Sequence, residues 1–387
     1  MYRPKRFNNR GNKPRFQKRG PSKLDPRLLI RKAEDMPVVE DYQPRYQFQD
    51  FPIKDELQQN IEAKGYDIPT PIQDQAIIPI LEGKDVIGLA NTGTGKTAAF
   101  TIPLIDKILR DPSQKVLILA PTRELAVQIH QEFLGFAKGT SITSSLCIGG
   151  ANMQVQIMQV RNSPNFIIGT PGRMKDLVMS KKLQLFRYQN IVLDEVDRML
   201  DIGFIRDIEF LLGQMPKDKQ SLFFSATLSQ EIQGLVYRFM KQPIMISVKK
   251  QETSNNVEQD VIRIGSRIKL DVLHDMLALE ECKKVLVFGR TKHGVEKLSK
   301  TLYVRGFKTA SIHGNKSQNQ RQRALEEFKA NKIQVLLATD VAARGLDIPN
   351  VTHVINYDLP ATYEEYVHRI GRTGRAGQKG FAVSFVD

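Results

Sequence analysis

The sequence predicts an α/β protein with two tandem domains, each a mostly parallel sheet with helices on both faces, preceded by a basic, largely disordered extension at 1–47. From about residue 48, short apolar runs alternate with amphipathic stretches, which is typical of parallel sheets with crossover helices. The 387 residues suffice for two or three domains. A polar, non-periodic segment at 248–258 is the expected linker between domains at 48–247 and 259–387.

The composition excludes several classes of protein. Hydrophobic residues make up 41% and charged residues 26%, which excludes a wholly disordered or fibrous chain. No apolar run approaches the roughly 18 residues needed to span a bilayer, so integral membrane proteins are excluded and we expect no membrane contact. The two cysteines, Cys147 and Cys282, cannot form a disulfide framework, which favours a reduced, cytoplasmic chain.

The net charge of +15 is concentrated near the N-terminus. Residues 1–32 hold twelve lysines and arginines and one acid, Asp25. Arginine and phenylalanine alternate with glycine at 6–11 and 15–20, so guanidinium groups can pair with phosphates while the rings stack on bases. We therefore expect this tail to bind nucleic acid. A solubilising tail stays an alternative, whereas the single serine and the lack of an apolar face argue against a transit peptide.

The strongest motif of the first half is a glycine-rich loop between an apolar strand at 85–90 and a helical stretch. It comprises Ala90, Asn91, Thr92, Gly93, Thr94, Gly95, Lys96 and Thr97. Its glycines let backbone N–H groups curl around a phosphate, and the following helix N-terminus adds a favourable dipole. Lys96 would reach the β- and γ-phosphates, and the Thr97 hydroxyl would bind Mg²⁺.

Two acids follow a later apolar run at 190–193. Asp194 is placed to hold Mg²⁺, and Glu195 to orient or deprotonate the attacking water. Two acids at a strand end are weak evidence by themselves, since a solvated strand end has the same pattern. With the phosphate loop upstream, they indicate hydrolysis of a nucleoside triphosphate.

These motifs and their neighbours resemble the DEAD-box ATP-dependent RNA helicases over about residues 48–387. The matching segments, in chain order, are 65–73, 90–97, 121–126, 149–150, 170–173, 194–197, 225–227, 313–314, Gln318 with Arg321, 339–347 and 368–375. The sequence departs from the family at Val196, where the motif after which the family is named has alanine. It also departs at its end, where relatives usually continue into one more helix. The resemblance implies two RecA-like domains that bind ATP, Mg²⁺ and RNA.

The resemblance assigns further residues to the nucleotide. Phe48, Tyr66 and Gln73 match the adenine-reading region, and Asp347 matches a ribose contact. A glutamine amide both donates and accepts, so Gln73 suits the N6/N7 edge of adenine and predicts ATP over GTP. Arg372 and Arg375 match residues of the second domain that stabilise charge on the γ-phosphate, an effect worth about 10³–10⁵ in rate.

Other matches are implied to bind RNA or to couple the domains. The RNA-backbone set is Arg123, Gly149, Gly150, Thr170, Arg173, Thr291, Gln318, Arg321 and Thr339. The coupling set is Asp197, Ser225, Thr227, His368 and Arg369. Hydroxyls, guanidinium groups and bare backbone N–H groups suit phosphate contacts, although singly each residue is more often part of a turn.

The resulting hypothesis is RNA-stimulated ATP hydrolysis coupled to local, non-processive unwinding of short RNA duplexes or remodelling of ribonucleoprotein. We expect a monomer that holds single-stranded RNA through its backbone, with accessory proteins left open. Two alternatives remain. One is an ATP-gated RNA clamp with little turnover, which Val196 alone among the sequence features favours, and the other is an ATP-driven DNA translocase. A small-metabolite kinase would leave the second domain and the tail without a role.

Overall fold

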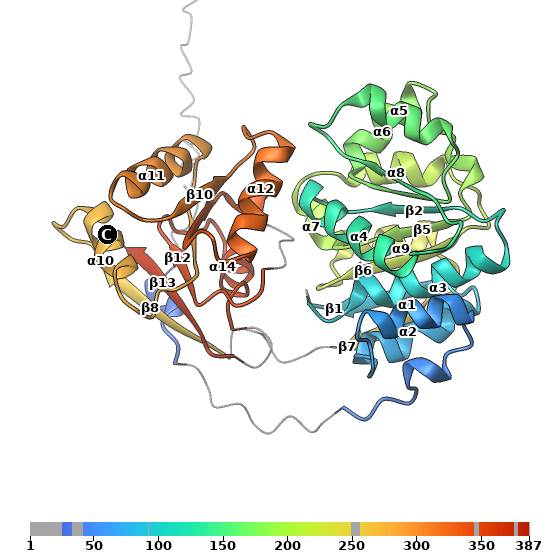
Figure 1. Ribbon diagram of the computed structural model, residues 1–387, viewed down its shortest axis with the longest axis horizontal. Helices are drawn as coiled ribbons and strands as arrows, with labels where there is room; N and C mark the ends of the chain where they lie inside the picture. The colour runs from blue at the N-terminus through green and yellow to red at the C-terminus, as the bar shows by residue number, and fades with distance from the viewer. Residues whose placement is uncertain are drawn as a thin grey trace, which may run out of the picture.

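The protein forms two lobes, each built on one parallel sheet (Figure 1). The computed structural model describes residues 25–32, 42–91, 93–248, 256–343, 348–374 and 378–386. The first lobe comprises residues 42–248, and the second comprises the described residues from 256 to 386. The predicted fold class, two parallel sheets with helices on both faces, is confirmed. The basic tail at 1–24, expected to lack a fixed structure, lies outside the described residues.

The first lobe contains a seven-stranded sheet of order β3-β4-β2-β5-β6-β1-β7. Its strands are β1 (Val86–Ala90), β2 (Val116–Leu119), β3 (Ser144–Cys147), β4 (Phe166–Gly169), β5 (Asn190–Leu193), β6 (Gln220–Ser225) and β7 (Ile244–Val248). All paired strands run parallel. Their carboxyl ends therefore share one edge, where ligands of open α/β sheets bind.

Helices cover both faces of this sheet. They are η2 (Phe48–Asp50), α1 (Asp55–Ala63), α2 (Pro71–Leu81), α3 (Lys96–Arg110), α4 (Arg123–Phe136), α5 (Met153–Arg161), α6 (Pro171–Met179), η3 (Leu185–Arg187), α7 (Val196–Asp201), α8 (Ile205–Gly213) and α9 (Gln230–Phe239). In β2, Val116 and Ile118 join the core under α1–α4, whereas Leu117 and Leu119 join the core under α6–α9. Burial on both faces explains why these strands are continuously apolar.

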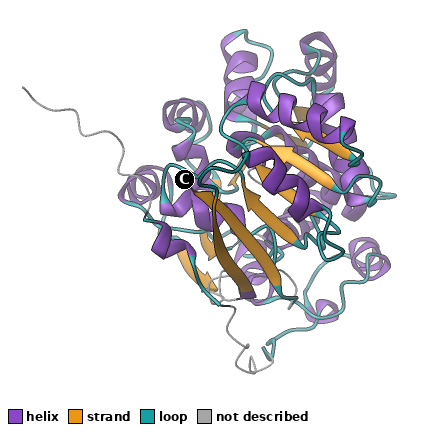
Figure 2. Cartoon of the chain, turned by 90° about the vertical axis from the view of Figure 1, so that its left-hand side faces the viewer, coloured by secondary structure: helices purple, strands orange, loops and turns teal. Residues whose placement is uncertain are grey.

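The second lobe contains a six-stranded sheet of order β10-β11-β9-β12-β13-β8. Its strands are β8 (Val257–Arg263), β9 (Val285–Phe288), β10 (Thr309–Ile312), β11 (Val335–Ala338), β12 (His353–Asn356) and β13 (Gly380–Val386). Its helices are η1 (Pro26–Leu29), α10 (Lys269–Leu277), α11 (Lys292–Val304), α12 (Gln318–Lys329), α13 (Asp340–Ala343) and α14 (Tyr363–Ile370). Figure 2 shows these strands between layers of helix. Within the described ranges, no helix is both long and apolar enough to span a bilayer.

The connection between the two sheets is shorter than the predicted linker at 248–258. β7 continues to Val248 and β8 begins at Val257, so both strands extend into the expected linker. The short helix η1 is a second difference from expectation, because it belongs to the N-terminal extension and yet packs on the second lobe. The division into domains at 47, 247 and 259 stays a prediction.

Candidate active site

The phosphate loop and the predicted acids lie at one half of the carboxyl edge of the first sheet. The phosphate loop follows β1, the acids Asp194 and Glu195 follow β5, and Ser225 ends β6. These three strands are consecutive in the sheet order β5-β6-β1. Segments more than a hundred residues apart in sequence are thereby brought together, as the parallel-sheet prediction requires.

Two glycines fix the path of the phosphate loop. Gly93 and Gly95 have φ angles of +80° and +90°, the left-handed region that glycine adopts without strain. A Cβ on Gly95 would lie 2.5 Å from the Gln73 amide nitrogen, so a larger residue would also push against α2. Thr92 lies outside the described residues.

Helix α2 holds the loop through side chains at its first turn. The buried Gln73 amide donates to the Gly95 carbonyl at 3.2 Å, and the Thr70 hydroxyl donates to the Thr94 carbonyl at 2.8 Å. Thr94 in turn donates to the carbonyl of Asn91. The contact of Gln73 with adenine stays a prediction, but its bond to the loop means that any change at Gln73 also reaches the phosphate site.

Lys96 and Asp194 are buried groups of opposite charge beside this loop. Lys96 begins α3, and its ammonium group donates to the Ala90 carbonyl at 2.8 Å. Burial raises the pKa of Asp194 to about 6, while the Lys96 ammonium opposes the rise and the Glu195 carboxylate adds to it. A buried carboxylate with a raised pKa is one that a nearby cation would stabilise in its charged form.

Glu195 is held in a strained, enclosed position. Its φ of +53° is uncommon for a residue with a side chain, and the residue is buried. Its Oε2 atom lies 3.4 Å from Arg198 Nε, yet it has no hydrogen-bond partner among the described residues. A buried oxygen of this kind is typical of a functional site that awaits water or a ligand.

The donor set fits a hydrated magnesium ion with a triphosphate. Asp194 supplies a buried carboxylate, Thr97 supplies a half-buried hydroxyl at the start of α3, and Mg²⁺ prefers such oxygen ligands. Among the described residues, no group of three His, Cys, Asp or Glu side chains forms a metal cluster of its own. This arrangement suits a metal that arrives with its nucleotide.

Asp197 joins α7 to the end of β6. Its carboxylate accepts from the Ala226 backbone N–H at 3.1 Å and from the Thr227 hydroxyl at 3.5 Å, and its own N–H donates to the Ser225 hydroxyl at 3.3 Å. The predicted coupling residues of the first lobe are therefore in contact. The neighbouring Val196 is fully buried in the apolar core, so the departure from the family motif lies in packing.

The predicted RNA residues of the first lobe occupy the other half of the same edge. Arg123 follows β2, Gly149 and Gly150 follow β3, and Thr170 follows β4. These strands are consecutive in the order β3-β4-β2. The Arg123 guanidinium lies close to the glycine pair, since a Cβ on Gly150 would be only 2.2 Å from its Nη1 atom.

Arg173 is tied to the loops beside this surface. It donates to the Gln156 side chain at 2.8 Å and to the Ala151 carbonyl at 3.4 Å, while its Nε has no partner among the described residues. The second lobe repeats the arrangement, because Thr291 follows β9, α12 follows β10 and Thr339 follows β11. The RNA contacts of these residues stay predictions.

An ion pair joins the two lobes at this edge. Arg321 of α12 lies 2.7 Å from the carboxylate of Glu124 in α4, and the Gln318 amide donates to the same carboxylate at 3.3 Å. All three side chains are buried, and α12 faces the first lobe in Figure 1. The sequence reasoning assigned Gln318 and Arg321 to RNA and missed Glu124, although the acid stands in a matched motif beside Arg123.

The predicted coupling residues of the second lobe are largely internal to it. Arg369 is buried and makes a bidentate pair with Asp340, at 2.5 and 2.7 Å. Arg372 is also buried, and its Nε donates to the His368 carbonyl at 3.3 Å. The structure thus anchors this motif, while delivery of Arg372 to a phosphate stays a prediction. Asp347 and Arg375 lie outside the described residues.

The aromatic residues assigned to adenine pack against one another. Phe48 is 2% exposed, and its ring meets that of Tyr66 edge-on at 5.6 Å between centroids. The Tyr66 hydroxyl donates to Glu132 at 2.7 Å, and its ring also contacts Phe136. The rings therefore have a packing role in this conformation, and stacking on a base stays a prediction.

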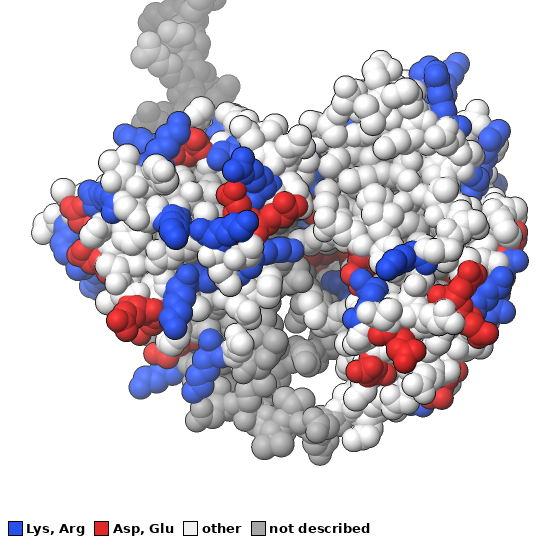
Figure 3. Space-filling model, viewed as in Figure 1, with Lys and Arg blue, Asp and Glu red and all other residues white. Residues whose placement is uncertain are grey.

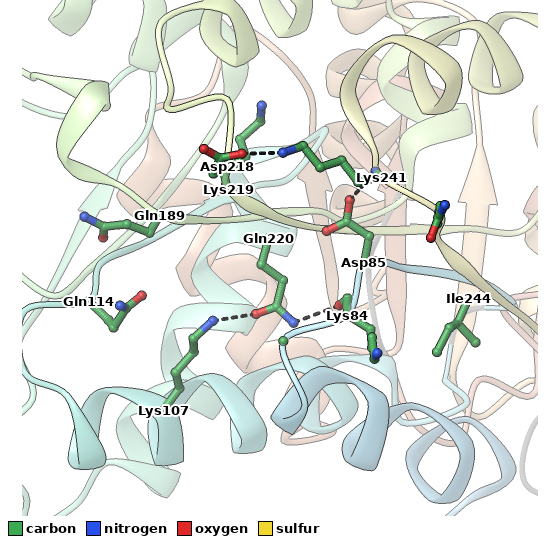
Figure 4. A pocket seen from close by; sticks show the side chains of 12 residues that line it. Lys84, Asp85, Lys107, Gln114, Gln189, Asp218, Lys219, Gln220, Lys241 and Ile244 are labelled. Carbon is green, nitrogen blue, oxygen red and sulfur yellow. Dashed lines mark hydrogen bonds and ion pairs between the residues drawn. The ribbon is translucent and has the colours of Figure 1, made fainter.

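A separate cavity of about 570 Å³ opens at the opposite, amino edge of the first sheet (Figure 4). Its polar groups are engaged with one another. Lys107 donates to the Gln220 side chain at 2.8 Å, and Gln220 donates to the Lys84 carbonyl at 2.8 Å. Asp85 accepts from the backbone N–H of Lys241 at 2.7 Å. This network joins the starts of the strands and includes none of the predicted site residues.

Comparison with known proteins gives matches over both lobes. Residues 70–235 match the family model of the DEAD/DEAH box helicase, and residues 268–377 match that of the helicase conserved C-terminal domain. The ATP-dependent RNA helicase CshA of Limosilactobacillus reuteri is 43% identical over 341 residues, which is 88% of this chain and 69% of the relative. The DEAD-box ATP-dependent RNA helicase CshA of Bacillus cereus is 45% identical over 88% of this chain and 65% of its own.

The chain thus spans about two thirds of the length of these curated relatives. Among solved structures, S. cerevisiae Dbp5 bound to RNA and ADP BeF3 has a TM-score of 0.77 and 31% identity, covering 88% of this chain and 89% of that one. This similarity confirms the predicted pair of RecA-like folds.

Proposed function

This chain belongs to the family of DEAD-box ATP-dependent RNA helicases, and we propose that it hydrolyses ATP when RNA is bound, using closure of its lobes to separate short duplexes or remodel ribonucleoprotein. One observation carries this proposal. The motifs predicted to bind nucleotide and RNA lie at adjacent halves of a single sheet edge, and the second lobe meets that edge through the pair of Glu124 and Arg321. A change at either ligand can therefore reach the contact between the lobes.

At the nucleotide, the first lobe supplies binding and proton transfer. Lys96 would exchange the Ala90 carbonyl for the β- and γ-phosphates. Asp194 and Thr97 would hold Mg²⁺, which neutralises charge on the phosphate oxygens when bound. Glu195 would accept a proton from the attacking water. The loop backbone from Ala90 to Gly95, with Gln73, would fix the nucleotide and favour adenine.

The second lobe would complete the site when it closes. Arg372 and Arg375 would stabilise charge that develops on the γ-phosphate, and Asp347 would contact the ribose. The pair of His368 and Arg369 would transmit closure toward the acids of the first lobe through Asp197 and its partners Ser225 and Thr227. The bonds that Asp197 makes to the end of β6 support this route.

RNA would lie across both lobes and be held through its phosphates and sugars. The residues proposed for this are Arg123, Gly149, Gly150, Thr170, Arg173, Thr291, Gln318, Arg321 and Thr339. Figure 3 shows basic and acidic side chains intermingled beside the hollow between the lobes. Backbone contacts of this kind predict little sequence preference, and the basic tail would add affinity that depends on salt.

The rate of ATP hydrolysis against RNA concentration, at two salt concentrations, tests the proposal. We expect saturable stimulation by RNA and a higher half-saturating concentration at the higher salt. Hydrolysis at a rate that does not depend on RNA concentration would contradict the proposal and favour the clamp. Equal stimulation by matched DNA would favour the translocase.

A further inference from the structure

We propose that residues 25–32 form a strap that ties the N-terminal extension to the second lobe and so limits how far the two lobes can separate. The strap precedes the first lobe in sequence but docks on the second. The chain therefore connects the two lobes twice, once through 33–41 and once through 249–255. The consequence for RNA rests on the proposed function, whereas the restraint on opening does not.

The strap is held by an apolar anchor and a strand-like bridge. Leu29 is 0% exposed and lies in a cluster with Val257, Tyr366 and Ile370. Arg31 and β8 exchange two backbone hydrogen bonds: its N–H donates to the Gln259 carbonyl at 3.0 Å, and the Gln259 N–H donates to the Arg31 carbonyl at 2.7 Å. Because β8 is the last strand of its sheet, this antiparallel bridge covers an edge that would otherwise be open.

The strap also contacts the helix that carries the coupling motif. Tyr366 of α14 is buried, and its hydroxyl donates to the Gln259 side chain at 3.1 Å and to the Leu29 carbonyl at 3.5 Å. His368 and Arg369 stand two and three residues further along the same helix. The strap therefore rests on the element that would move when the second lobe closes.

The connection through residues 33–41 is fixed to the first lobe at its C-terminal end. The carboxylate of Asp74, in α2, accepts from the backbone N–H groups of Arg45 and Tyr46 at 3.1 Å and from the Tyr42 hydroxyl. Asp74 is buried and adjoins Gln73 of the nucleotide site. Both ends of the crossing are therefore held.

The length of the crossing sets the restraint. Ten residue steps separate Lys32 from Tyr42, and a fully extended chain spans about 3.3–3.6 Å per residue, so these two points cannot move more than about 35 Å apart while the strap is docked. A hinge restrained by two covalent crossings opens less than a hinge restrained by one. Release of the strap should therefore widen the range of distances between the lobes. It should also lower the affinity for RNA that contacts both lobes.

Distances between dyes on the two lobes test this inference. Cysteines introduced at Tyr237 and Val304 are suitable, because these positions are 90% and 85% exposed, whereas the native Cys147 and Cys282 are buried. Leu29→Asp places a charge in the apolar anchor and should release the strap. Ile30→Asp is the matched control, since it adds the same charge at a neighbour that is 58% exposed.

Without nucleotide or RNA, single-molecule energy transfer should show longer and more widely spread distances for Leu29→Asp than for the parent or Ile30→Asp. A flexible insertion of about 20 residues after position 36 should have the same effect while leaving both anchors intact. If both changes leave the distances as in the parent, the strap is overturned.

The concentration of RNA that half-saturates ATP hydrolysis gives a separate readout. We expect this RNA concentration to rise at least about threefold for Leu29→Asp and to stay unchanged for Ile30→Asp. Wider separation lowers the effective concentration of the second lobe's RNA-binding surface near RNA that is already bound to the first lobe. If the distances widen but RNA does not stimulate hydrolysis in any variant, the strap stands and the proposed function fails.

Discussion

At the scale of single residues, two acids of the candidate site lower the stability of the protein. One carries a buried charge, and the other has a strained backbone. Asp194 is buried with a raised pKa, and Glu195 has a left-handed backbone and a carboxylate oxygen without a hydrogen-bond partner among the described residues. Such arrangements weaken the protein without its ligands and are relieved when the ligands bind. Stability and function should therefore respond in opposite directions to changes at these two acids.

Asp194→Asn should stabilise the nucleotide-free protein in a pH-dependent way. The folded-state pKa of Asp194, about 6, lies above the ordinary value, so the unfolded protein loses the proton first. The parent therefore loses stability as pH rises from about 4 to about 6 and stays at the lower level above that, whereas the amide does not ionise. We expect a gain of about 1–3 kcal/mol at pH 8 that vanishes near pH 4. Urea unfolding across this range measures it, and an amide variant less stable at every pH would refute the argument.

Glu195→Gln should separate binding from hydrolysis. The amide keeps the size of the side chain but cannot accept a proton from water, so turnover should fall by about 10²–10⁴-fold while ATP still binds. The complex with RNA should then persist. Single-turnover hydrolysis and RNA dissociation are the measurements. Release of RNA as fast as from the parent would show that Glu195 does not activate the water.

At the scale of elements, the sequence was sufficient to predict the position of a segment wherever a local pattern of residues determines the geometry. The phosphate loop and the acids after β5 lie at one sheet edge because parallel strands share their carboxyl edge, although β6 separates the two strands, and their roles stay predictions. The contact of α12 with α4 was not foreseen, since no local pattern says which residue a buried arginine will meet across two lobes. The strap was missed for the same reason: its buried residue Leu29 stands in a segment whose charge suggested disorder.

Arg321→Met should uncouple the lobes. It leaves the Glu124 carboxylate buried without its cation, so RNA-stimulated hydrolysis should fall about tenfold, equivalent to about 1.4 kcal/mol. The matched control is Arg323→Met on the same helix, where the arginine is exposed and pairs with Glu327. Steady-state ATP hydrolysis at saturating RNA makes the comparison.

Adding Glu124→Gln to Arg321→Met completes a double-mutant cycle. If the two residues act as a pair, the double variant should lose little more than either single variant. Fully additive losses would instead indicate that Arg321 acts through RNA alone, as the sequence first suggested.

At the scale of the whole molecule, the proposed RNA binding involves both lobes and the basic tail. Removing residues 1–24 deletes nine lysines and arginines while leaving the strap. The slope of log affinity against log salt should become shallower by about 0.7 for each RNA phosphate that the tail no longer neutralises. A scrambled tail of equal composition should restore the slope. Filter binding over a salt series measures this slope. An unchanged slope would indicate that the tail only keeps the protein soluble.

The account depends on a nucleotide site that neither lobe completes by itself. The most direct test compares ATP hydrolysis by the full chain and by residues 42–248, each at saturating RNA and with nucleotide binding measured separately. We predict that the first lobe alone binds nucleotide but shows no stimulation by RNA. Hydrolysis by that lobe at the rate of the full chain would contradict the account.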